Sequence, residues 1–149
     1  GASDAAAEGS EAGGACNALA VTGPVVDLFA VVSEPPAGAG GAVADGEYDL
    51  TEARIYGVAG GGATDVTLQG ALRVDATSST MDRVLVRQAA GVPQESRVTL
   101  AYATNGANLT TSITCPAGGG QEQATYTATG TTLVITNVVT RESYVFTRR

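Results

Sequence analysis

Two cysteines, eight arginines, five tyrosines and two phenylalanines are the residues of this 149-residue chain most able to react or to bind a ligand. Histidine and lysine are both absent. The chain therefore lacks the commonest general base and the amine that forms Schiff bases. It also contains no nucleophile elbow and no paired catalytic motif. We therefore expect a protein that is not an enzyme.

The two cysteines, Cys16 and Cys115, are far apart in the sequence, a spacing that suits one long-range disulfide. Closing a loop of roughly 100 residues stabilises the folded state by about 4–5 kcal/mol in the chain-entropy model. Such a bond predicts maturation in an oxidising compartment. The alternative is two separate buried thiols. Two thiolates without histidine do not complete a tetrahedral metal site, so we expect no metal and no cofactor.

Inward-facing arginines and aromatic rings are the candidate ligand contacts. Arg83 and Arg87 share one face of an extended segment with Met81 and Leu85. An inward arginine would anchor a carboxylate or a phosphate. The alternative interpretation is that the arginines lie in solvent and the rings only fill the core. The candidate ligand-binding residues are Tyr48, Arg83, Arg87, Tyr102, Tyr126, Tyr144 and Phe146.

Alternation of apolar and polar residues predicts eight strands after residue 46. In the first strand the alternation slips between Leu50 and Ile55, which a β-bulge would explain. Asn105-Gly106 predicts a tight hairpin. An earlier apolar segment, residues 25–32, is a strand or one short helix, and its β-branched residues favour a strand. The eight strands are residues 47–56, 65–75, 80–88, 97–104, 108–115, 123–129, 132–137 and 143–148.

The short connections between these strands favour an all-β, eight-stranded, antiparallel up-and-down barrel. A two-sheet β-sandwich satisfies the same pattern and is the alternative. We expect residues 1–15 to be a flexible tether and residues 16–149 to be one domain, in which an extension (16–44) precedes the strands (46–149). The disulfide would pin the N-terminal segment across one mouth of the barrel. The Gly/Ala linker, residues 37–44, would cross one end or one face of the domain.

The net charge of −7 disfavours binding to nucleic acid or to an anionic membrane surface. Cations that are all arginine suggest a GC-rich bacterial genome. The acidic residues Asp45, Glu47, Asp49 and Glu52 alternate between two faces of a strand, which favours surface charge over a calcium site. The oligomeric state is not encoded in any of these features.

The strand pattern resembles lipocalin-like exported proteins of Gram-negative bacteria, many of them lipoproteins. Gly46-Glu47-Tyr48 lies where classical lipocalins carry Gly-x-Trp, Thr114-Cys115-Pro116 is central, and Tyr144-x-Phe146-x-Arg148 closes the chain. The resemblance implies a periplasmic or outer-membrane-anchored protein, tethered through an N-terminal lipid. It also implies a small apolar ligand inside the barrel. The alternative function is a structural or interaction module, or a periplasmic inhibitor acting through its loops.

Overall fold

The computed structural model describes residues 16–149, so the predicted tether, residues 1–15, lies outside the described residues. The described residues form nine β-strands and no helix. None of them forms a helix long and apolar enough to span a membrane. The strands are β1 Val26–Val31, β2 Gly46–Tyr56, β3 Gly62–Asp75, β4 Thr80–Ala89, β5 Val92–Asn105, β6 Asn108–Cys115, β7 Gln121–Ala128, β8 Thr132–Asn137 and β9 Glu142–Arg148.

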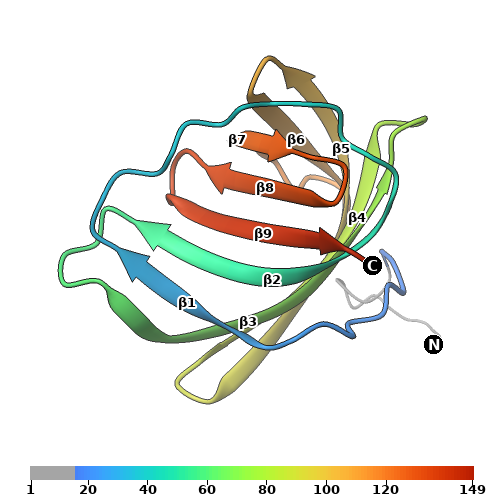
Figure 1. Cartoon of the computed structure of the whole chain (residues 1–149). Coiled ribbons are helices and arrows are strands. Elements are labelled where there is room, and N and C mark those ends of the chain that lie inside the picture. The colour runs from blue at the N-terminus through green and yellow to red at the C-terminus, as the bar shows by residue number, and fades with distance from the viewer. Residues whose placement is uncertain (1–15) are drawn as a thin grey trace.

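Strands β2 to β9 pair with their neighbours in chain order, and β9 then pairs with β2 to close a barrel (Figure 1). The closing pairs run from Tyr48 opposite Arg148 to Ile55 opposite Glu142. All of these pairings are antiparallel, as short hairpin connections require. The predicted closed all-β barrel is therefore confirmed, and the two-sheet sandwich is wrong.

The predicted number of strands is wrong, because β1 is a ninth strand of the same sheet. Strands β2 and β3 pair only between Gly46 and Asp49, and the predicted bulge follows in β2 between Leu50 and Glu52. Beyond it β2 and β3 diverge, and β1 fills the gap. It pairs in parallel with residues 53–56 of β2 and antiparallel with residues 62–68 of β3. The sheet is therefore mixed, not purely antiparallel.

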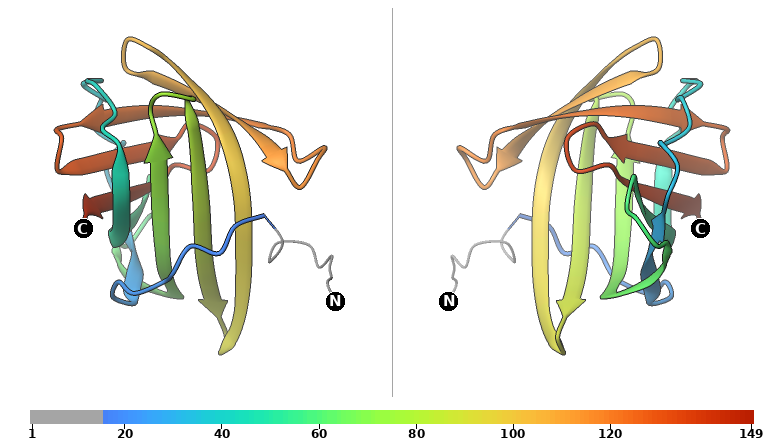
Figure 2. Two further views of the ribbon diagram at one scale, coloured as in Figure 1. Left: turned by 90° about the vertical axis from the view of Figure 1, so that its right-hand side faces the viewer. Right: turned by 90° about the vertical axis from the view of Figure 1, so that its left-hand side faces the viewer.

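The predicted disulfide between Cys16 and Cys115 is present, with a Cα–Cα distance of 5.6 Å. The N-terminal segment that it fixes, residues 16–24, crosses the outer wall of the barrel (Figure 2). Its Leu19 is buried there against Ala71 and Val84, in a cluster separate from the barrel interior. The expectation that this segment crosses a mouth is therefore wrong. An apolar outer face on two neighbouring strands gives the segment a place to bury its leucine.

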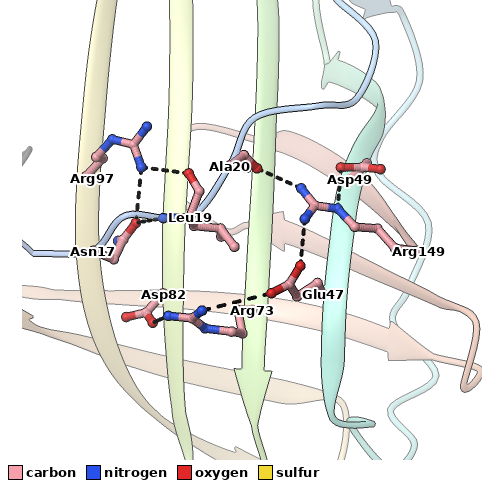
Figure 3. A network of polar contacts seen from close by, with 9 residues as sticks. All are labelled: Asn17, Leu19, Ala20, Glu47, Asp49, Arg73, Asp82, Arg97 and Arg149. Carbon is pink, nitrogen blue, oxygen red and sulfur yellow. Dashed lines mark hydrogen bonds and ion pairs between the residues drawn. The ribbon is translucent and has the colours of Figure 1, made fainter.

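Polar contacts from two arginines fix the first part of the same segment, Asn17 to Ala20 (Figure 3). Arg97 of β5 donates to the carbonyl oxygen of Leu19 at 2.7 Å and to Oδ1 of Asn17 at 3.4 Å. Arg149 donates to the carbonyl oxygen of Ala20 at 2.7 Å and also pairs with Glu47 and Asp49. The segment therefore lies across β2 to β5 as a fixed part of the outer wall.

The Gly/Ala linker closes one end of the barrel, called here the closed end. Tyr48 and Tyr126 donate their hydroxyl hydrogens to the carbonyl oxygens of Ala44 and Gly41. A side chain at Gly41 would meet the carbonyl oxygen of Ala128, and the φ angle there is +112°. Only glycine combines that backbone angle with so close an approach. Because glycine has no side chain, the linker can lie directly on the strand ends at residues 41–44.

Candidate ligand-binding cavity

A cavity of about 250 Å³ lies inside the barrel, and neither the linker nor the two tyrosines of the closed end line it. Its floor is apolar and consists of Leu72, Met81, Leu100 and Phe146, each about 1% exposed. Alternation along four different strands turns these side chains to the interior. Leu85, Ala124 and Ile135 continue the apolar lining. The cavity thus offers an apolar surface enclosed by the barrel wall.

One charged group in the cavity, Arg87, makes two hydrogen bonds to a carboxylate. Arg87 donates from its two terminal nitrogens to the two carboxylate oxygens of Glu142, at 3.1 and 3.2 Å. The hydroxyl group of Tyr144 donates to the same carboxylate. The hydrogen bond to Glu142 raises the pKa of Arg87 above its usual value, and burial is the main cause that raises the pKa of Tyr144. Arg87 therefore stays a cation and Tyr144 stays neutral at physiological pH.

A second charged pair is much looser. The guanidinium of Arg83 lies 3.6 Å from a carboxylate oxygen of Glu122, and within residues 16–149 it donates no hydrogen bond. The Arg83 side chain is 21% exposed, whereas Glu122, across the cavity on β7, is 41% exposed. A guanidinium carries five N–H donors in a planar fork. Arg83 therefore brings unused donors to the wall of a largely apolar cavity.

Four of the seven predicted ligand-binding residues lie together on this cavity: Arg83, Arg87, Tyr144 and Phe146. The other three do not line it. Tyr48 and Tyr126 are buried and bonded to the linker at the closed end. Tyr102 is half-buried against the same core. These three tyrosines therefore lie in or against the packed core and not on the cavity.

The acidic members of the cavity, Glu122 and Glu142, were missed by the sequence prediction. Glu142 alternates with Tyr144 and Phe146 along β9, and Glu122 alternates with Ala124 and Tyr126 along β7. Both glutamates lie one residue before the predicted start of their strand. Extending the alternation by one residue at each start would have placed both in the interior.

Comparison of the chain with protein-family models gave no match. Comparisons with curated proteins and with solved structures also gave no match. The cavity and its side chains are therefore the basis for inferring a function.

Proposed function

We propose that the protein binds a small, mostly apolar molecule in the barrel cavity and is not an enzyme. The observation that carries this proposal is the enclosed apolar floor with charged groups at one side. Binding sites for small molecules combine an apolar lining with a few placed polar groups, and they measure roughly 300–1,000 Å³ for drug-sized ligands. A cavity of about 250 Å³ fits a smaller ligand. We also propose that the protein is exported and tethered by an N-terminal lipid. The disulfide supports only the part of this proposal that requires an oxidising compartment.

Straight-chain alcohols from butanol to decanol, titrated by calorimetry, test this proposal. Each buried methylene contributes about 0.8 kcal/mol, so affinity should rise roughly fourfold per carbon and level off once the chain fills the cavity. Ala124→Phe and Ile135→Phe place a ring in the cavity and should abolish binding. Ala103→Phe adds the same ring at an exposed position of β5 and should bind as the wild type does. Far-UV circular dichroism checks that each variant is folded. Alcohol binding that both filled-cavity variants retain would refute a cavity site.

A second candidate function, an interaction module acting through loops, is favoured by the turn between β8 and β9. Val138 is 52% exposed and Val139 is 82% exposed there. A partner that a Val138→Ser, Val139→Ser variant no longer binds, while alcohol binding is unchanged, would support this function over the first. A partner that binds the variant equally well would remove the turn from consideration.

A further inference from the structure

We propose that the natural ligand carries one carboxylate, which binds the guanidinium of Arg83 in place of Glu122. This inference rests on the proposed function and adds the ligand's chemical class. Among residues 16–149, Arg83 is a mostly buried cation on the cavity wall whose one ion pair is long. A bidentate carboxylate would satisfy two of its donors at once.

Glu122 is a partner that a ligand can displace. Its side chain is 41% exposed, and its closest approach to Arg83 is 3.6 Å. An ion pair that lacks a hydrogen bond and has one partner in solvent contributes about 0–1 kcal/mol. The glutamate can therefore turn into water while the ligand takes its position, without leaving a charge buried and unpaired.

Arg87 is unsuited to the same role. Both of its terminal nitrogens are already bonded to Glu142, whose side chain is only 14% exposed. A ligand that displaced Glu142 would leave that carboxylate buried without its cation, and would also strip the acceptor from Tyr144. Arg87 and Glu142 therefore form a fixed wall, and Arg83 remains as the docking point.

Charge balance in the cavity favours a single negative charge. With Glu122 turned outward, Arg83 and Arg87 contribute +2 and Glu142 contributes −1, which leaves +1. A monocarboxylate brings the sum to zero. A dianionic phosphate would make it −1. An amine would leave Glu122 beside Arg83, so it raises a balanced sum of zero to +1. The carboxylate head and apolar floor together describe a short-chain aliphatic or aromatic acid.

Octanoate, octan-1-ol and octylamine are matched probes, because they share one apolar chain and differ in the head group. Charge-assisted hydrogen bonds from Arg83 should make octanoate bind about 10- to 100-fold more tightly than octanol at pH 7.5. Octylamine should bind more weakly than octanol, since it adds a cation to a cavity in which both glutamates are already paired with arginines. Isothermal titration calorimetry measures all three affinities.

Two variants and one control locate the effect. Arg83→Gln should bring octanoate down to the affinity of octanol, whereas octanol binding should change little. Glu122→Gln removes the competing carboxylate at an exposed site, so octanoate should bind several-fold more tightly. Arg54→Gln removes the same charge from an exposed arginine of β2 outside the cavity and should change neither affinity.

The outcomes separate this inference from the proposed function. Equal binding of octanol and octanoate, or tighter binding of octylamine, would overturn the carboxylate assignment and leave the apolar site standing. Octanoate selectivity that survives Arg83→Gln, or is lowered by Glu122→Gln, would overturn the role of Arg83. Absence of binding by all three probes would refute the cavity site itself and this inference with it.

Discussion

Removal of the disulfide by Cys16→Ala and Cys115→Ala should destabilise the protein by about 4–5 kcal/mol. The two cysteines are 99 residues apart, and the chain-entropy model assigns about 4.7 kcal/mol to a closed loop of roughly 100 residues at 25 °C. Domains are usually stable by only about 5–15 kcal/mol. The loss is therefore a large fraction of the whole, and the variant should be partly unfolded well below the denaturant midpoint of the oxidised protein.

Urea denaturation followed by far-UV circular dichroism measures this effect, because the chain has no tryptophan to report by fluorescence. Reduced wild type serves as the control and should match the double variant. The slope of the unfolding free energy against urea should be larger without the crosslink, since the unfolded chain is then less compact. A loss under about 1 kcal/mol with an unchanged slope would show that the bond does not act by restricting the unfolded chain.

Three further predictions concern other parts of the molecule. Leu19→Ala should lower the free energy of unfolding by about 2–3 kcal/mol, near the low end for buried leucines, because the N-terminal segment can move to fill the space. Ala18→Ser, at an exposed neighbouring position, should change it little. Thermal denaturation compares the two variants. Ala90 has a φ of +54° in the two-residue turn that it forms with Gly91. Asparagine tolerates this left-handed conformation better than alanine, so Ala90→Asn should raise the free energy of unfolding by roughly 0.5–1 kcal/mol in urea melts. A lower free energy of unfolding would contradict strain at that turn. The raised pKa of Tyr144 contributes stability that is complete below the ordinary tyrosine pKa of 10.0 and is lost as pH rises above it. Wild type should therefore lose more stability than Tyr144→Phe between pH 9 and pH 11. Equal losses would contradict the burial of the Tyr144 hydroxyl group.

Much of the barrel could be predicted from alternation alone, but in β4 apolar residues lie on both faces, so alternation there does not show which face is inward. Met81 and Leu85 point to the interior, whereas Val84 is buried on the outer face beneath Leu19. A strand that is covered on both faces has no polar side to reveal its orientation. The covering segment lies more than 60 residues earlier, so no local pattern announces it.

Strand β1 illustrates a second limit. Its apolar residues indicated a strand, but its partners in β2 and β3 depend on where those two strands diverge. The hairpin after β5 was predicted correctly but one residue too early, because Asn105 still pairs with Asn108 and the turn is Gly106-Ala107. Alternation predicts the face of the sheet to which each side chain points, but it does not predict which strands pair or in what register.

The distribution of side chains inside the barrel argues for a binding role over simple packing. Tyr48 and Tyr126 fill the closed end and hold the linker there through their hydroxyl groups. The carboxylate of Glu142, at 14% exposure, has lost much of its hydration, while its partner Arg87 is 41% exposed. The free energy of removing such a carboxylate from water is not always recovered by its ion pair. Two arginines and two glutamates around an apolar floor are thus a poor solution to filling space, and a larger residue at Ala124 would be a simpler one. Charged groups beside an apolar floor do not help the barrel to pack, but they suit the binding of a molecule with an apolar body and a charged head.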